Sequence, residues 1–202
     1  MNKNNRREQL YKAAFKLFLS HPYGDVSISA IEKEAKMTRG AITYYAGSKL
    51  ELFQDVVKYF FIDKQQLQAD IELNECSLKD YIEKYIETIA KQMHSMKALI
   101  DEVQPTNASR AYISLGLNLK SYSEELHYSY LDIRNKSLTN WITTIQRARA
   151  NSEIRKDIDV LSIAEMFVFI YLGVSVWDAM LSGLDIEHLK RQYFAMYRLL
   201  KP

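Results

Sequence analysis

Apolar residues recur at helical spacing along most of the chain. The first such stripe lies in residues 6–19 and consists of Leu10, Ala13, Ala14, Leu17 and Phe18. The same kind of spacing predicts helices over residues 49–68, 78–98, 124–150, 160–181 and 186–200, and the apolar, aromatic run 111–122 is predicted to be helical with weaker periodicity. The chain has only 6 Gly and 3 Pro, which disfavours a turn-rich sheet protein. We therefore predict an all-α fold.

Two short helices joined by a tight turn are predicted between residues 27 and 49. Ser27 and Ser29 are both good N-cap residues, and Ser29 with Glu32 has the spacing of a capping box. Thr38 can cap a second helix, which begins at Arg39 and runs to residue 46. This is the layout of a helix-turn-helix, whose second helix fits the major groove of DNA.

An ordered set of residues runs through this N-terminal part: Arg7, Ala13-Ala14, Leu17-Phe18, Ile31, Ala35, Met37-Thr38-Arg39-Gly40-Ala41-Ile42, Ser48-Lys49 and Leu52-Phe53. In order and spacing the set resembles the DNA-binding domain of the TetR family of bacterial transcriptional repressors. The resemblance implies an N-terminal three-helix helix-turn-helix DNA-binding domain, which we assign to residues 1–49. It also implies a C-terminal helical effector-binding and dimerisation domain, which we assign to residues 50–202.

Four positions depart from the family pattern. The family usually has Gly where Lys36 stands, a small residue where Glu32 stands, a phosphate-contacting Tyr where Thr43 stands and Phe where Ala46 stands. The position of Lys36 commonly has a left-handed backbone, which costs a Lys about 1 kcal/mol. The departures at Lys36, Thr43 and Ala46 keep open a second hypothesis, a helical ligand- or partner-binding module that does not bind DNA.

Charge is unevenly distributed along the chain. Residues 1–49 carry nine Lys or Arg and four Asp or Glu, whereas the whole chain has a net charge of +2. A basic head on a mildly acidic body is typical of a DNA-contacting domain joined to a second domain, although solvated surface charge gives the same count.

The resemblance implies that the helix over residues 39–46 enters the major groove. Arg39 is the candidate for a base edge, because a guanidinium can pair with guanine O6 and N7. Gly40 and Ala41 allow close approach to the bases. The other candidates offer a hydroxyl or an ammonium to phosphates: Ser27, Thr38, Thr43, Tyr44, Tyr45 and Lys49. A two-fold symmetric homodimer would bind a palindromic operator.

The C-terminal part offers candidates for an effector pocket and a dimer interface. The pocket candidates are mostly residues that combine apolar bulk with a hydroxyl or a thioether: Tyr85, Ile89, Met93, Met96, Tyr112, Tyr122, Trp141 and Tyr171. For each of them an ordinary helical core is the alternative. The last two predicted helices resemble the pair with which TetR-like proteins dimerise, and the interface candidates are Phe167, Ile170, Val174, Trp177, Leu189, Tyr193 and Met196. A small molecule bound in this domain is expected to release the DNA.

The predicted helix over residues 160–181 is apolar nearly all round and long enough to span a membrane. Glu165 and Asp178 lie within it, which argues against a membrane span. We therefore predict a helix that is buried on most sides. The polar N-terminus and the single Cys favour a cytoplasmic protein.

The sequence predicts no catalytic centre. It has no glycine-rich phosphate loop, no nucleophile elbow and no metal-spaced pair of Cys. Glu124 and His127 have the spacing used in carboxylate-bridged metal bundles, but a second such pair is missing. We therefore predict a ligand-responsive transcriptional regulator that acts as a repressor, with no enzyme activity, no cofactor and no metal. The expected partners are double-stranded operator DNA, a second copy of the chain and an unidentified small molecule.

Overall fold

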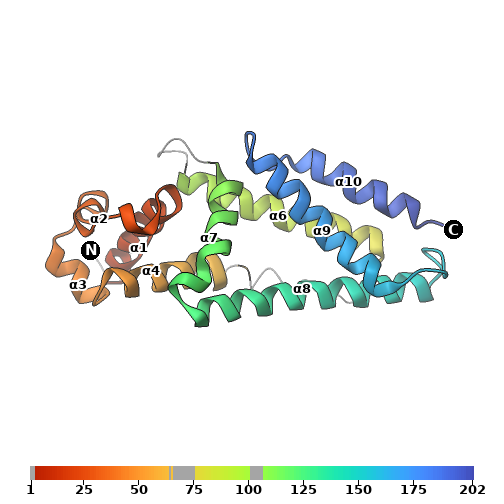
Figure 1. Ribbon diagram of the computed structural model, residues 1–202, viewed down its shortest axis with the longest axis horizontal. Helices are drawn as coiled ribbons and strands as arrows, with labels where there is room; N and C mark the ends of the chain where they lie inside the picture. The colour runs from red at the N-terminus through yellow and green to blue at the C-terminus, as the bar shows by residue number, and fades with distance from the viewer. Residues whose placement is uncertain (1–2, 64, 66–75, 101–106) are drawn as a thin grey trace.

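The computed structural model describes residues 3–63, 65, 76–100 and 107–202, and every regular element within them is helical (Figure 1). The N-terminal elements are α1 (Lys3–Ser20), the 3-10 turn η1 (Tyr23–Asp25), α2 (Ile28–Ala35), α3 (Arg39–Tyr45), α4 (Lys49–Val57) and the π-helix η2 (Lys58–Ile62). They are followed by α6 (Leu78–Ile100), α7 (Ala108–Tyr122), α8 (Glu124–Ala150), α9 (Val160–Ala179) and α10 (Ile186–Leu199). The all-α prediction is confirmed.

The head of the molecule consists of α1 to α4. Helix α1 packs against α2 and α4, and its predicted apolar stripe supplies Leu10 and Ala14 to the core, where Leu52 and Val56 of α4 are also fully buried. A helix of about 12 residues or fewer is marginally stable by itself in water. Burial of apolar side chains is therefore the main contribution to the stability of the short helices α2, α3 and α4.

Side-chain caps begin each short helix of the head. The hydroxyl of Ser27 accepts a hydrogen bond from the amide of Ala30 at 3.1 Å, and Thr38 and Ser48 cap α3 and α4 in the same way. The capping box predicted at Ser29 and Glu32 is wrong. Because α2 already begins at Ile28 under the Ser27 cap, Ser29 lies inside the first turn of the helix.

The helix predicted over residues 49–68 changes geometry part of the way along. Helix α4 ends at Val57, and the next five residues form the π-helix η2, in which Phe60 and Phe61 are buried. A π-helix adds one residue to each hydrogen-bonded turn and is often found at functional sites. The last part of that prediction lies outside the described residues.

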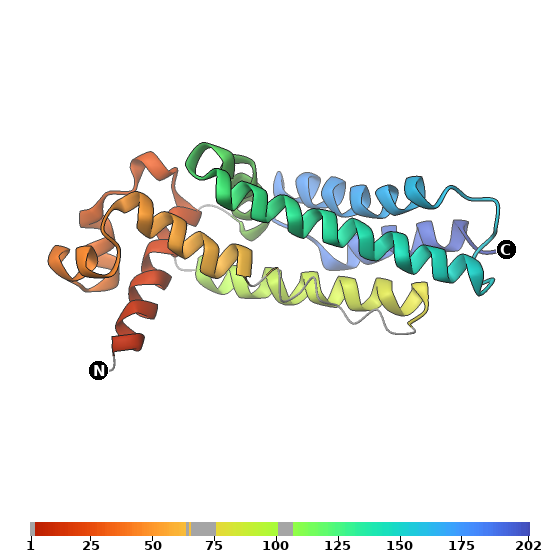
Figure 2. The ribbon, with the colours of Figure 1, turned by 90° about the horizontal axis from the view of Figure 1, so that it is seen from below.

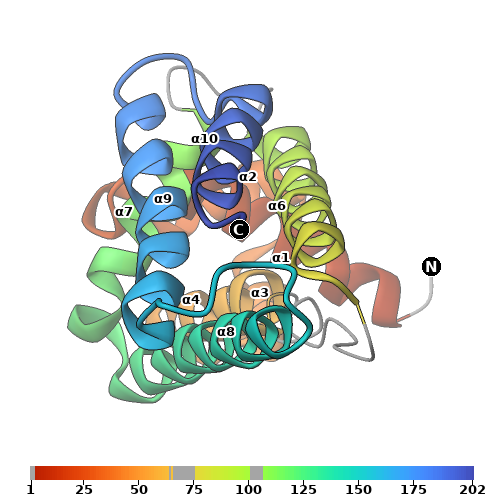
Figure 3. The ribbon, with the colours of Figure 1, turned by 90° about the vertical axis from the view of Figure 1, so that its right-hand side faces the viewer.

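The body is built around a second core. Viewed from one end, α6, α8, α9 and α10 surround this core (Figure 3). At its centre the ring of Trp141 is fully buried and stacks on the rings of Phe167 and Tyr193, at centroid distances of 4.6 and 5.7 Å. The stack joins α8, α9 and α10 and fixes which face of each helix points inward.

Helix α7 bridges the head and the body (Figures 1 and 2). At its start, the Arg110 guanidinium donates to the carbonyl of Ala179 at the end of α9, at 3.0 Å. At its other end, the carbonyl of Tyr122 accepts a hydrogen bond of 3.1 Å from the side-chain amide of Gln54 in α4. Helix α7 therefore contacts both the end of α9 and the helix that leaves the head.

Helix α9 is apolar on its outward face as well as its inward face. Phe169 and Trp177 are 60% and 63% exposed, and Met166, Val176 and Met180 are exposed beside them. The helix meets the length and composition of a membrane span, as its sequence does. The prediction that it is buried on most sides is wrong for the single subunit, because the Trp141 stack covers only the face that carries Phe167.

Candidate DNA-binding surface and effector cavity

Helix α3 lies at the end of the molecule opposite the C-terminus (Figure 1), and the side chains on one of its faces are polar and exposed. Ile42 is 2% exposed and packs into the head, whereas Arg39, Thr43 and Tyr44 are exposed, Tyr44 by 68%. The hydroxyl of Thr43 donates to the carbonyl of Arg39 at 3.0 Å, so it already has a partner on its own helix. The Tyr44 ring meets Tyr45 edge-on at 5.2 Å.

The remaining predicted DNA-contact residues lie on or beside this face. Ser27 and Thr38 are exposed at the starts of α2 and α3, Gly40 is exposed and Ala41 is half-buried. A depression of about 380 Å³ at the start of α3 is lined by Arg6, Gln9, Lys36, Met37, Thr38 and Ala41. It brings the cationic residues Arg6 and Lys36 next to the helix that we expect to meet the DNA.

Lys36 adopts the left-handed conformation, with φ 52° and ψ 46°, between α2 and α3. Its backbone amide donates to the carbonyl of Lys33 at 3.3 Å, which closes α2. The turn therefore keeps the conformation that the resemblance implies, although the residue is not glycine.

Lys49 is turned toward the head. Its ammonium donates to the carbonyls of Tyr23 and Val26, both at 2.7 Å, and lies 4.2 Å from the centroid of the Tyr23 ring. These contacts hold the segment that precedes α2. A phosphate at Lys49 would share the ammonium with the two carbonyls, so a positioning role accounts for this residue better than a direct phosphate contact.

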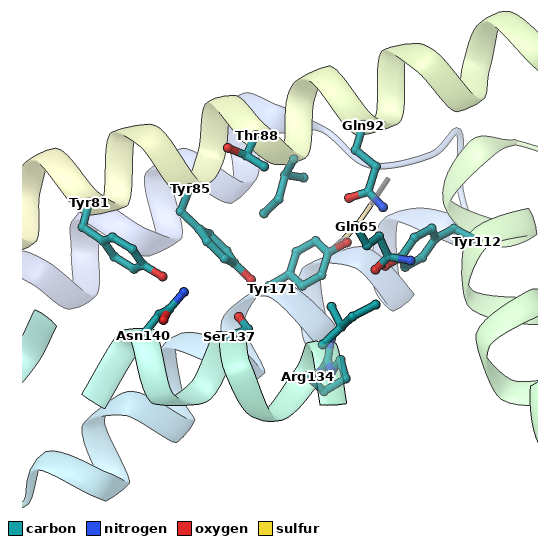
Figure 4. Close-up of a pocket in the computed structure, with 12 residues that line it drawn as sticks. Gln65, Tyr81, Tyr85, Thr88, Gln92, Tyr112, Arg134, Ser137, Asn140 and Tyr171 are labelled. Atoms are coloured by element: carbon teal, nitrogen blue, oxygen red, sulfur yellow. The ribbon is translucent and has the colours of Figure 1, made fainter. Parts of the chain in front are cut away.

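A cavity of about 70 Å³ lies between α6, α7, α8 and α9 (Figure 4). It is lined by Gln65, Tyr81, Tyr85, Thr88, Ile89, Gln92, Tyr112, Ile133, Arg134, Ser137, Asn140 and Tyr171. Four of the predicted pocket residues are among them, namely Tyr85, Ile89, Tyr112 and Tyr171. The structure therefore brings these four together around one space.

The other predicted pocket residues lie elsewhere. Trp141 is fully buried in the stack, and Met96 is buried in the core of the head. Tyr122 packs against Phe53 with ring centroids 4.9 Å apart, and Met93 accepts a weak contact of 3.8 Å from the Ser109 hydroxyl beside a different depression. These four were chosen by residue type, but the face of the helix on which each residue lies determines whether its side chain reaches the cavity.

Sequence reasoning missed the polar lining residues of α8. Arg134, Ser137 and Asn140 line the cavity from α8 and follow one another every three positions, and Asn140 is buried. Polar residues at that spacing resemble a solvated helix face, which is how they escaped notice. The signal was their alignment with Trp141 on the same side of the helix.

Buried hydroxyls dominate the chemistry of the cavity. Loss of hydration on burial raises the pKa of Tyr85, Tyr112 and Tyr171, so all three stay protonated and can donate hydrogen bonds. The Tyr112 hydroxyl donates to the side-chain oxygen of Gln65 at 2.5 Å. The positive charge of Arg134 acts in the opposite direction on the pKa of each tyrosine, which places the guanidinium within electrostatic reach of these hydroxyls.

The structure separates the predicted interface residues into two groups. Phe167, Leu189 and Tyr193 are 0% exposed and Val174 is also buried, so they form the core of one subunit and cannot contact another. This part of the prediction is wrong because the Trp141 stack occupies that face. Trp177 is exposed, and Ile170 and Met196 are half-buried at the surface.

Comparison with known proteins agrees with this architecture. Residues 10–56 match the family model described as bacterial regulatory proteins, tetR family. In sequence, no curated protein matches the chain.

Solved structures resemble the whole chain in fold. A transcriptional regulator of the TetR/AcrR family has a TM-score of 0.70 at 15% identity, covering 96% of this chain and 100% of that one. PfmR, a TetR-family regulator from Thermus thermophilus, has a TM-score of 0.69 at 15% identity, covering 94% and 97%. The reduced form of NemR from E. coli has a TM-score of 0.64 at 16% identity, covering 98% of each chain. At such low identity these structures establish the fold.

Proposed function

We propose that this chain, whose residues 10–56 match the N-terminal domain of bacterial regulatory proteins of the tetR family, acts in the cytoplasm as a homodimeric repressor. Each subunit inserts α3 into a major groove of a palindromic operator, and a small molecule in the cavity between α6 and α9 releases the DNA. The observation that carries the proposal is the outward presentation of Arg39 on a helix whose Ile42 is anchored in the head.

On the DNA, the groups around α3 have distinct tasks. Arg39 reads a base edge, since its guanidinium is exposed and two-pronged. Ser27, Thr38 and Tyr44 offer hydroxyls to the phosphates on either side, and Arg6 and Lys36 add positive charge. Lys49 acts indirectly, by holding the segment that sets the position of α2.

The dimer forms through the outward face of α9. Phe169, Trp177 and their exposed apolar neighbours make a continuous apolar strip on this helix, and large exposed strips of this kind mark interfaces. A second α9 packed antiparallel to the first, flanked by the two copies of α10, covers the strip. That arrangement also explains why α9 is apolar on its outward face without a membrane. Because the dimer has a two-fold axis, it binds an operator whose two half-sites form a palindrome.

Release of DNA passes through the Gln65–Tyr112 contact. Gln65 follows the π-helix that continues α4, and Tyr112 is in α7, so their hydrogen bond joins the cavity wall to the helix that leaves the head. A ligand that competes for either side chain favours a different position of α4. The spacing of the two α3 helices in the dimer then no longer fits the half-sites.

The alternative function, a module that does not bind DNA, rested on the departures at Lys36, Thr43 and Ala46. Lys36 nevertheless keeps the left-handed turn, so this departure does not alter the geometry of the helix pair. We assign the phosphate contact to the exposed Tyr44 and its neighbour Tyr45 rather than to Thr43, whose hydroxyl donates to the carbonyl of Arg39.

The proposal is tested by selecting bound fragments from sheared genomic DNA and then comparing variants on a library of the selected site. We expect a palindromic consensus, and we expect Arg39→Ala to lose preference at one base pair in each half-site, at a cost of about 1–3 kcal/mol. Lys33→Ala, which removes an exposed cation from α2, serves as the matched control and should keep the base preference. Unaltered base preference in Arg39→Ala, or a consensus without symmetry, would contradict the proposal.

A further inference from the structure

We propose that the cavity binds a compact aromatic carboxylate and that the guanidinium of Arg134 receives its carboxylate. This inference rests on the proposed role of the cavity as the effector site, and it adds the chemical class of the effector.

The charge of the lining selects an anion. Among the described residues that line the cavity, Arg134 is the one with a charged side chain, and the polar remainder are amides and hydroxyls. No carboxylate of the described residues pairs with Arg134. Figure 4 shows Arg134 and Ser137 on α8, across the cavity from Thr88 and Gln92 of α6. A half-buried guanidinium in this setting gains most from a ligand that brings the missing negative charge.

The hydroxyls near Arg134 suit a carboxylate as well. Tyr85 and Tyr171 line the same space, and burial keeps their hydroxyls protonated, as described above. Each can therefore donate a hydrogen bond but cannot contribute a competing negative charge. A guanidinium and two hydroxyl donors together match the four lone-pair positions of a carboxylate.

The walls and the size of the cavity select a planar apolar body. Ile89, Ile133 and the faces of the tyrosine rings supply apolar surface around the polar groups. The volume of about 70 Å³ is small beside the roughly 300–1,000 Å³ of sites for drug-sized ligands. Benzene occupies an engineered cavity of about 150 Å³, so even one aromatic ring with a short acidic group requires the lining side chains to move apart, and an extended molecule is excluded.

The test uses three compounds of the same shape and different charge: benzoate, benzamide and benzamidine. Their binding to the full-length protein in the absence of DNA is measured by calorimetric titration at neutral pH and low salt. We expect benzoate to bind at least about tenfold more tightly than benzamide, because a charge-assisted hydrogen bond is worth more than a neutral one. Cationic benzamidine should bind most weakly.

Variants identify the receiving group. Arg134→Gln should weaken the binding of benzoate at least about tenfold and change the affinity for benzamide by no more than about twofold. Arg134→Lys should keep part of the preference for benzoate, since lysine keeps the charge but cannot form two parallel hydrogen bonds to a carboxylate. Lys136→Gln removes an exposed positive charge two residues away on the same helix and should leave the affinity for benzoate and for benzamide unchanged. Thermal unfolding of each variant establishes that it is folded.

The inference is overturned if benzamide binds as tightly as benzoate, if Arg134→Gln does not affect benzoate, or if none of the three compounds binds. These results leave the regulator itself untouched, because operator binding of the same proteins is measured separately. Conversely, failure of the unliganded protein to bind any DNA would contradict the proposed function while the preference for benzoate could still be observed.

Discussion

The hydroxyl of Tyr112 in α7 donates a hydrogen bond of 2.5 Å to the side-chain oxygen of Gln65, whose amide in turn donates to the carbonyl of Phe61 at 2.6 Å. All of these groups are buried. Two elements that are far apart in sequence, the π-helix η2 and the wall of the cavity, are thereby joined through a pair of side chains. Occupation of the cavity can therefore alter the continuation of α4 without contacting the head.

The Tyr112→Phe variant should weaken the effect of a ligand in the cavity on DNA binding by the head. It removes the hydrogen-bond donor and leaves a buried oxygen of Gln65 unsatisfied, so we expect the free energy of unfolding to fall by about 1–3 kcal/mol. In the same variant, the ligand should change DNA affinity less than it does in the unaltered protein. Urea unfolding and operator titrations with and without ligand measure both effects. Tyr128→Phe, which removes a hydroxyl from an exposed tyrosine of α8, is the control, and equal losses in the two variants would contradict the coupling.

The Lys49→Met variant tests the positioning role of Lys49. The change keeps most of the side-chain volume but deprives the carbonyls of Tyr23 and Val26 of their donor, and we expect a loss of about 1–3 kcal/mol in the free energy of unfolding. Lys12→Met is the control, because the ion pair of Lys12 with Glu8, at 2.8 Å, is exposed and such pairs are worth about 0–1 kcal/mol. A Lys49→Met variant with unchanged stability and weaker DNA binding would instead restore Lys49 as a direct phosphate contact.

Replacing Lys36 with glycine should stabilise the head. The left-handed backbone at φ 52° is strained for a residue with a Cβ, and its relief outweighs the larger chain entropy of glycine, so we expect a gain of up to about 1 kcal/mol. The matched change Lys33→Gly, three residues earlier within α2, should destabilise by about 1 kcal/mol. Thermal unfolding of both variants distinguishes the two positions. Destabilisation of similar size in each would show that the strain at Lys36 has been overestimated.

The Trp177→Glu variant should separate the subunits without unfolding them. Trp177 is 63% exposed on α9. A charge at this position should therefore disrupt an apolar interface between subunits and have little effect on the packing within one subunit. Light scattering after gel filtration should report a monomer, with circular dichroism unchanged. Leu117→Glu, an equally drastic change at an exposed position of α7, should leave the dimer intact. A dimeric Trp177→Glu protein would rule out the proposed interface.

Phe167→Ala addresses the opposite face of the same helix. Because the Phe167 ring is fully buried and stacks on Trp141 at 4.6 Å, we expect the free energy of unfolding to fall by about 3–5 kcal/mol. Equilibrium unfolding in urea at one fixed protein concentration measures this loss. A loss below about 1 kcal/mol would mean that the stack does not hold the body together.

The helices and the helix-turn-helix could be predicted because their signals are local. The caps at Ser27 and Thr38 begin the helices that they were expected to begin, and α8 has its predicted bounds of 124–150. Capping depends on a few neighbouring residues, and helical periodicity on a few turns. The π-helix escaped because residues 49–62 are compatible with an unbroken α-helix, and the wider turn depends on how Phe60 and Phe61 pack.

The inward and outward faces of α9 could not be predicted, because both carry large apolar side chains. Phe167 and Phe169 are two positions apart and chemically identical, yet one is 0% and the other 60% exposed. Their difference is set by Trp141 and Tyr193, which belong to other helices. The cavity was missed in part for the same reason, since Arg134 and Asn140 meet residues of α6 and α9 only after the body is assembled.

The most direct test of the account is the affinity of the unliganded protein for its selected operator, measured at a series of salt concentrations. Docking of α3 and its flanking hydroxyls and cations on a duplex predicts that log affinity falls linearly with log salt concentration, with a slope of about −0.9 for each phosphate neutralised. Arg39→Ala should keep most of this slope while losing base preference. An affinity that does not change with salt, or no binding to any duplex at low salt, would contradict the claim that this head binds DNA.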